Sequence, residues 1–318
     1  MPLASVFYRP PAPPRAVQRA VGIAAVIAQS LIAVTGSVVR VTGSGLGCPT
    51  WPQCSGRSMV PVAHPELGQF HQWVEFGNRL LVVVVCVVAA LCLITALLTR
   101  PHRRRYLWLA ATMPLGVVAE AVIGGITVLM HLAWWTVCIH FLVSPVLVWF
   151  AVLFYRAVDE GDQQPRPLLA RRLPQVASVL LALLLAAGTL VTAAGPHSGD
   201  VNTPRLQVPI PLLTLLHATL LVLFLASLVT IGLRLRATGS ATLRRRYLVL
   251  IIMVLLQGAL GVIQYYMGVP DFIVPFHILG AVLVTGGMAS VWCAARDRGQ
   301  AIATVAVPAS GDSALTTA

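Results

Sequence analysis

The chain contains no lysine, and all 22 of its basic residues are arginine. Acidic residues are also scarce, because only 10 of the 318 residues are Asp or Glu. Charged residues make up 10% of the chain, whereas soluble proteins carry roughly 25%. Hydrophobic residues make up 58%, and the mean hydropathy is +0.85. This balance excludes an ordinary soluble domain and predicts an integral membrane protein whose solvent is the lipid bilayer.

Eight segments are apolar and long enough to cross a bilayer, which takes about 20 residues. Backbone groups in lipid must be hydrogen-bonded within the protein, so we expect an all-α membrane protein rather than one with open strands. The first segment has a basic start, as signal peptides do, but no small-residue cleavage site clearly ends it, and we interpret it as a retained helix. The eight predicted helices lie at about 18–39, 73–98, 106–130, 135–155, 174–194, 211–234, 246–267 and 273–294.

The arginines are distributed unevenly between the two ends of these segments. Eighteen lie in the N-terminal segment, in the connections after the second, fourth and sixth helices, or in the C-terminal tail. Basic residues favour the cytoplasmic side, so we expect a multi-pass protein of the plasma membrane with both termini in the cytoplasm. Membrane topology explains the charge of +12 better than nucleic-acid binding, and no nucleic-acid partner is expected. The opposite end holds only Arg40, Arg57, Arg79 and Arg205.

Two of the six cysteines lie in a loop rather than in an apolar run. Cys48 and Cys54 belong to "GSGLGCPTWPQCSG", which the arginine distribution places outside the cell, where disulfides persist. We expect a structural disulfide between them, with a redox-active pair as the alternative. A zinc site is a poorer interpretation because no second pair of ligands accompanies them.

The two halves of the chain align with each other. "GSVVRVTGSGLGC" from Gly36 matches "GTLVTAAGPHSGD" from Gly188 without gaps, and "EAVIGGITVLM" at 120–130 matches "QGALGVIQYYM" at 257–267. We therefore expect two pseudo-symmetric four-helix bundles related by an axis along the membrane normal. The predicted boundaries are a disordered cytoplasmic tail at 1–17, a first bundle at 18–155 with an outer loop at 40–72, a cytoplasmic linker at 156–173, a second bundle at 174–295 and a disordered cytoplasmic tail at 296–318.

The second half places two histidines near the outer ends of different helices, His217 and His277. A histidine within lipid is uncommon and usually functional. Facing imidazoles across an apolar bundle are typical of a haem b site with two axial histidines, and we predict that role for this pair. An interhelical hydrogen bond is the alternative for a single histidine, whereas zinc would need further ligands that this half lacks.

The first half offers a matching position with different residues. His140 corresponds to His277, but Asn78 stands where the second half has His217. His71 and Glu75 are spaced to share a helix face with Asn78. An ordinary polar helix end is the alternative, but Glu75 begins a long apolar helix, so we expect it to face a cavity. Arg79 is a candidate partner for a haem propionate or for Glu75.

The remaining polar residues carry less weight. Glu120 aligns with Gln257, and we interpret it as an interhelical hydrogen-bonding group rather than a proton relay. Gly124 and Gly125 are typical of close helix packing. Three further histidines are expected to be solvated in or near outer loops: His64, His131 and His197.

These motifs together resemble the haem A synthase family. The resemblance covers residues 20–295 approximately and is carried by "TGSGLGCPTWPQC", by "EFGNR", by "GGITVL" and by the three histidines His140, His217 and His277. It implies an enzyme that oxidises a ring methyl of haem O to a formyl group, giving haem A for terminal oxidases. It further implies that His217 and His277 bind haem b, that His140 binds the substrate haem and that Glu75 takes part in catalysis, and it identifies Cys48 and Cys54 with the outer-loop cysteine pair of the family.

The sequence departs from the family at two places. The helix motif is commonly E-x-x-H-R in the family, but Asn78 replaces the histidine here, and the second outer loop lacks the cysteine pair that some relatives have. His71 is a candidate substitute ligand; otherwise that side of the iron stays open. The implied partners are haem O, the lipid bilayer, an electron donor that the sequence does not identify, and the haem O synthase.

Two other functions stay open at this point: a non-catalytic membrane electron carrier with two haem b groups, and a haem transporter or chaperone. A carrier should hold two equivalent permanent haems. The difference at Asn78 instead favours one permanent haem b and one exchangeable substrate haem.

Overall fold

The computed structural model describes residues 11–62, 68–238 and 240–301. Within these residues the chain forms eight helices, each long and apolar enough to cross a membrane. The all-α prediction is therefore confirmed, and the protein is a multi-pass membrane protein. The helices are α1 (Arg15–Val41), α2 (Gln69–Leu98), α3 (Arg104–Leu129), α4 (Trp134–Ala157), α5 (Arg172–Ala194), α6 (Ile210–Leu235), α7 (Ala241–Tyr266) and α8 (Val274–Ala294).

Several helices begin earlier than hydropathy predicts. The start of α7 is an example: the apolar run suggests residue 246, but the helix begins at Ala241 because the Ser240 hydroxyl accepts a hydrogen bond from the Leu243 amide (3.3 Å). Such caps satisfy backbone groups of the first turn. Arginine side chains near helix ends reach the membrane surface with their charged heads, so a helix can begin in a sequence that looks polar.

The two predicted tails are shorter than expected. Residues 15–17 belong to α1, and a short antiparallel pair joins β1 (Arg166–Pro167) to β2 (Arg296–Asp297). The backbone at residues 296–297 is therefore ordered by pairing with the predicted linker. The outer parts of the two predicted disordered tails, 1–10 and 302–318, lie outside the described residues.

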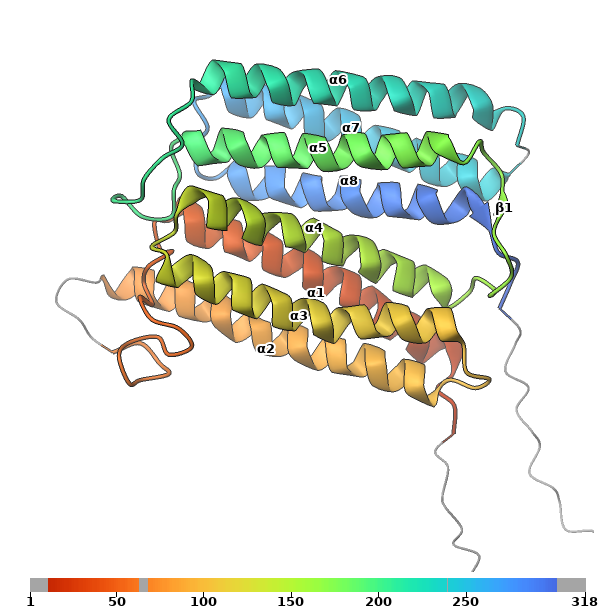
Figure 1. The fold of residues 1–318 in the computed structure, drawn as a ribbon, viewed down its shortest axis with the longest axis horizontal. Coiled ribbons are helices and arrows are strands. Elements are labelled where there is room, and N and C mark those ends of the chain that lie inside the picture. The colour runs from red at the N-terminus through yellow and green to blue at the C-terminus, as the bar shows by residue number, and fades with distance from the viewer. Residues whose placement is uncertain (1–10, 63–67, 239, 302–318) are drawn as a thin grey trace, which may run out of the picture.

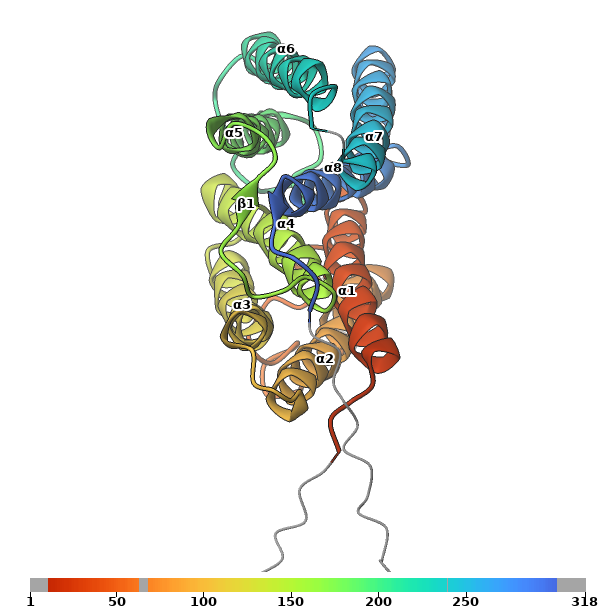
Figure 2. The same ribbon diagram turned by 90° about the vertical axis from the view of Figure 1, so that its right-hand side faces the viewer.

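The helices pack as two sets of four. Sequential neighbours within α1–α4 contact one another, and so do those within α5–α8. The two sets lie side by side along their length (Figure 1). Figure 2 shows α4 and α8 next to each other where the sets meet, and α8 also contacts α1. The buried side chains at this junction are Ala33, Val148 and Val282.

Contacts at both ends of the helices join the two sets. At one end the Arg156 guanidinium donates to the Ser290 hydroxyl (3.0 Å), and the Arg15 side chain donates to the Ala301 carbonyl (2.6 Å). We call this the arginine-rich end; both terminal segments leave the bundle there (Figure 1). At the other end, which we call the loop end, the Gly45 amide of the α1–α2 loop donates to the carbonyl of Gly199 in the α5–α6 loop (2.8 Å).

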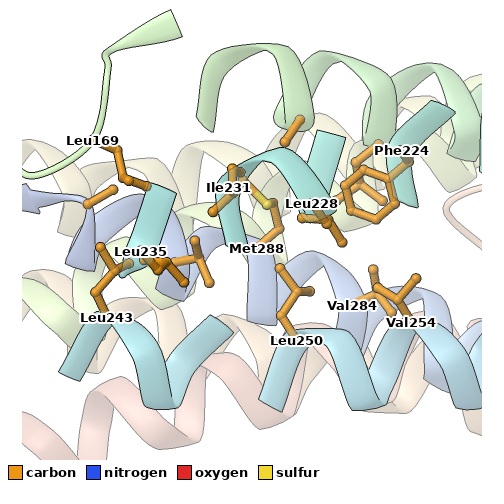
Figure 3. Packing of buried hydrophobic residues seen from close by; sticks show 14 of the residues in the cluster. Leu169, Phe224, Leu228, Ile231, Leu235, Leu243, Leu250, Val254, Val284 and Met288 are labelled. Carbon is orange, nitrogen blue, oxygen red and sulfur yellow. The ribbon is translucent and has the colours of Figure 1, made fainter. Parts of the chain in front are cut away.

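The apolar cores fill the part of each set nearer the arginine-rich end. In the second set, leucines, Phe224 and Met288 from four helices form one buried cluster (Figure 3). A similar cluster in the first set includes Tyr106 stacked on Phe154, with ring centroids 4.8 Å apart. Van der Waals packing of this kind is the main force that holds membrane helices together. His140 lies on the loop side of the first cluster, and His217 and His277 lie on the loop side of the second.

Candidate functional site

The repeat-equivalent polar residues occupy stretches of helix in which no residue is buried. His217 lies between the buried Leu213 and Phe224 of α6, and His277 lies between Val274 and Val282 of α8. In the first set, Asn78 and His140 lie in corresponding intervals, between Glu75 and Val85 of α2 and between Thr136 and Pro145 of α4. The helices are therefore loosely packed at the level of these four residues, and closely packed from there toward the arginine-rich end.

A glycine on the neighbouring helix faces each of the three histidines. A Cβ placed on Gly188 would lie 3.0 Å from Cε1 of His217. The corresponding distance is 3.1 Å for Gly261 and His277, and 3.1 Å for Gly124 and His140. The prediction that Gly124 serves helix packing thus becomes more specific, because these glycines make room for imidazole rings.

The hydrogen bonds of His217 suit a metal ligand. Its Nδ1 donates to the Leu184 carbonyl (3.0 Å), so the ring proton lies on Nδ1. The other ring nitrogen, Nε2, then carries a free lone pair. Metal-binding histidines in proteins are commonly oriented in this way by a second hydrogen bond.

His277 contacts the side chain of Gln257. The Gln257 amide nitrogen donates to the His277 carbonyl (2.8 Å) and lies 3.1 Å from Nδ1 of the same residue. The Gln257 carbonyl oxygen is buried without a hydrogen-bond partner. For Nε2 to be free to bind a metal, the Gln257 amide would have to release the His277 carbonyl and present its oxygen to Nδ1.

His140 has a carboxylate partner at the equivalent position. Its Nδ1 lies 2.7 Å from a Glu120 oxygen, and the other Glu120 oxygen accepts a hydrogen bond from Ser144 (2.8 Å). As expected, Glu120 makes polar contacts between helices, but its role next to His140 was missed. The repeat carried the signal, because Glu120 and Gln257 are separated by the same 137 residues as His140 and His277.

Asn78 makes a different contact from the histidine at the equivalent position of the second half. Its side-chain oxygen accepts a hydrogen bond from the Thr35 hydroxyl (2.7 Å). A Cβ placed on Gly36, the equivalent of Gly188, would meet nothing within 4 Å. The second set thus has the His217 ring against Gly188, where the first set has the Asn78 amide bound to Thr35 of the neighbouring helix. The two halves differ in shape here as well as in composition.

Glu75 and Arg79 connect α2 to the outer loop. Arg79 is bound to Glu75 through two of its nitrogens (2.6 and 3.1 Å), and the second Glu75 oxygen accepts from the Cys48 amide (2.6 Å). Arg79 also donates to the carbonyls of Cys48, Thr50 and Gln53 (2.8, 3.0 and 3.1 Å). Of the two partners predicted for Arg79, it binds Glu75, and its remaining donors serve the loop.

The loop itself is cross-linked and packed onto the helices. Cys48 and Cys54 form a disulfide, and both are fully buried, so the predicted pairing is confirmed. Trp51 lies against α3 at Gly125, where a Cβ would approach the indole to 2.5 Å. Gly125 therefore serves loop packing rather than helix packing.

His71, His131 and His197 lie nearer the loop end. His71 is seven residues before Asn78, which is about 10 Å along a helix axis, and its Nδ1 contacts the Ser44 hydroxyl (3.0 Å). His197 is not solvated as expected, because it is held by the Val269 carbonyl and the Asp271 carboxylate (2.7 and 3.0 Å). His131 is exposed, in agreement with expectation, and His64 lies outside the described residues.

Comparison with known proteins gives consistent matches. A protein from Geobacillus kaustophilus named "Heme A synthase" is 35% identical over 130 residues, which are 39% of this chain and 37% of that protein. A "Heme A synthase" from Geobacillus thermodenitrificans is 33% identical over 150 residues, 46% of this chain and 43% of that protein. The matched segments thus span less than half of the length of either relative.

A family match covers more of the chain. Residues 19–197 match the model of the COX15-CtaA family, described as cytochrome oxidase assembly protein. The match runs from α1 through α5 and includes the disulfide loop, Glu75, Asn78 and His140. Because it covers more than half of the sequence, this protein belongs to the COX15-CtaA family of cytochrome oxidase assembly proteins.

Proposed function

We propose that this protein is a haem A synthase, which oxidises a ring methyl group of haem O to a formyl group and so makes haem A for terminal oxidases. One observation carries the proposal: the two halves offer corresponding positions with unequal ligands. One half has His217 and His277, and the other has His140 opposite Asn78. A permanent cofactor suits the first arrangement and an exchangeable substrate suits the second. The named relatives support the same activity.

The second half fits haem b as the resident cofactor. His217 and His277 would be its axial ligands, and Gly188 and Gly261 give the two rings their space. Three buried side-chain oxygens on α6 and α7 have no hydrogen-bond partner among the described residues: those of Thr214, Gln257 and Gln264. When bound, haem b would supply one-electron transfer. The residues of this half hold it, orient its ligands and exclude water with the apolar core below.

The first half would bind the substrate haem through Nε2 of His140. The Glu120 carboxylate, 2.7 Å from Nδ1, would accept the Nδ1 proton and orient the ring once the two groups align, and Ser144 donates to the other Glu120 oxygen. A carboxylate partner makes an imidazole a more basic ligand than an amide partner does. Because Asn78 stands at the position equivalent to His217, α2 offers the substrate haem no histidine at the level of His140. A contribution of Asn78, Arg79 and His71 to substrate binding stays a prediction.

Glu75 is the residue we propose for the chemistry of this half. Conversion of a methyl to a formyl group is a four-electron oxidation that removes two hydrogen atoms from the carbon and adds one oxygen atom, so the site must move protons as well as electrons. Glu75 is 5% exposed, and a buried carboxylate can accept a proton or stabilise positive charge. Arg79 and the Cys48 amide hold both of its oxygens, so accepting a proton there would require one of these contacts to loosen.

The finer predictions on setting belong to the same proposal. The pseudo-symmetry of the two sets, the plasma membrane and the cytoplasmic position of both termini follow from the repeat and the arginine distribution. The loop end would then face outward. Haem O is the proposed substrate, with the haem O synthase and an electron donor as partners.

Pigment analysis of the purified protein tests the proposal. Expressed in cells that make haem O, the protein should yield haem B together with haem O or haem A on extraction. Glu75→Gln should keep the haem b spectrum but yield haem O without haem A, and His277→Ala should remove that spectrum. Haem B alone, with no conversion of added haem O, would refute the synthase and favour an electron carrier.

A further inference from the structure

A cleft lies in the part of the molecule nearer the arginine-rich end. It has a volume of about 330 Å³ and lies between α1 and α7, with α4 and α8 behind it. Figure 2 shows α1 and α7 on the same side of the molecule with α8 between them. Its walls are apolar and include Ile23, Ile27, Val249, Met253 and Leu283. None of the histidines described above lines it.

The cleft is accessible from the side, where the bilayer lies. Ile27 is 59% exposed, and Ile23, Val249 and Leu283 are 43–44% exposed. In a membrane-spanning helix, exposed apolar side chains at this depth contact lipid chains. The volume falls at the lower end of the range of ligand pockets, about 300–1,000 Å³. The cleft is therefore a groove into which a chain from the surrounding bilayer can enter.

Three arginines line the same cleft: Arg156, Arg245 and Arg246. Arg156 donates to the Ser290 hydroxyl and Arg246 to the Ser290 carbonyl, both at 3.0 Å. Two guanidinium groups thus converge on one residue. Arg245 is exposed, and within the described ranges it forms neither a hydrogen bond nor an ion pair.

No carboxylate in the described part of the chain neutralises these three arginines. The nearby acids are paired with other cations: Asp159 binds Arg19, Glu160 binds Arg105, and Asp162 binds Arg103. The Nε of Arg156 is also buried without a hydrogen-bond partner. Converging guanidinium groups without an acid are typical of a site for a phosphate group, which accepts several of their hydrogen bonds at once.

We propose that this cleft binds an anionic phospholipid. The phosphate would lie among Arg156, Arg245 and Arg246, and one acyl chain would lie along the apolar wall between α1 and α7. Basic pockets between membrane helices bind lipid headgroups in this manner. The combination of an apolar groove with a cationic end selects a lipid over a free phosphate, which would gain nothing from the groove. This site is separate from the proposed haem positions and does not depend on the enzymatic activity.

Lipid analysis of the purified protein tests this inference. Native mass spectrometry in mild detergent should detect phosphatidylglycerol retained by the protein and no retained phosphatidylcholine. Arg245→Gln combined with Arg246→Gln should weaken that retention about 30-fold. Arg244→Gln is the matched control: it removes the same charge from the preceding residue of α7, which does not line the cleft.

A second variant separates lipid from free phosphate. Gly286 lies in the cleft wall, and Gly286→Leu should fill the groove, displace phosphatidylglycerol and leave the arginines intact. Elution of each variant at the wild-type position in size-exclusion chromatography shows that it is folded. Equal lipid retention in the arginine double variant and the wild type would overturn the proposal, as would an equal loss in Arg244→Gln. The proposal would also be overturned, in favour of an ion site, if millimolar inorganic phosphate displaced phosphatidylglycerol while Gly286→Leu retained this lipid as the wild type does.

Discussion

The contact between Gly188 and His217 makes the proposed haem b site sensitive to a single methyl group. In Gly188→Ala the new Cβ would lie 3.0 Å from Cε1 and 3.4 Å from Nδ1 of the ring, whereas carbon atoms in contact are normally about 3.5–4.0 Å apart. The ring must therefore move by about 0.5 Å or more, away from the Leu184 carbonyl that holds it. Overpacking of this kind costs roughly 1–3 kcal/mol, which corresponds to a loss of about 5- to 150-fold in haem b affinity.

The repeat provides the control for this experiment. Gly36→Ala makes the same substitution at the equivalent position of the first half, where a Cβ would meet nothing within 4 Å. Haem b content and the reduced-minus-oxidised spectrum of each purified variant give the measurement. Gly188→Ala should lose haem b at dilution while Gly36→Ala keeps it. Full haem b in Gly188→Ala, or an equal loss in both variants, would show that the glycine does not position the ligand.

Two further predictions concern the partners of the ligands and the outer loop. Exchanging a carboxylate for an amide in Glu120→Gln should raise the reduction potential of a haem bound at His140 by about 60 mV, the equivalent of roughly 1.4 kcal/mol, and Gln257→Glu should lower that of haem b similarly. Redox titration measures both, and shifts of the same sign would contradict the argument. Cys54→Ser should cost about 2 kcal/mol of stability from loop closure alone, seen as a lower thermal midpoint; an unchanged midpoint would mean that Arg79 holds the loop unaided.

Hydropathy and the internal repeat predicted much of the fold. The eight helices followed because lipid allows few alternatives for runs such as 211–234. The repeat also placed Glu120 opposite Gln257. Helix ends were less predictable, since the sequence before residue 246 is polar and gains its helical start from the Ser240 cap.

The contacts of individual side chains could not be predicted in the same way. A linear pattern specifies the face of a helix but not which neighbour that face meets. For that reason Arg79 was a candidate for two partners, and the role of Gly125 beneath Trp51 was assigned to helix packing. The contact of His140 with Glu120 joins α4 to α3. The sequence gives the order of these two helices but not how each is rotated about its own axis.

The ties between the two helix sets fix the distance that an electron would cover. Gly45 and Gly199 join the sets at the loop end, and Arg156 and Ser290 join them at the arginine-rich end. With α4 and α8 packed between these points, neither set can swing away from the other without breaking contacts at both ends. Under the proposed function, electron tunnelling between the halves would cross a constant gap, and its rate would be set by driving force rather than by domain motion.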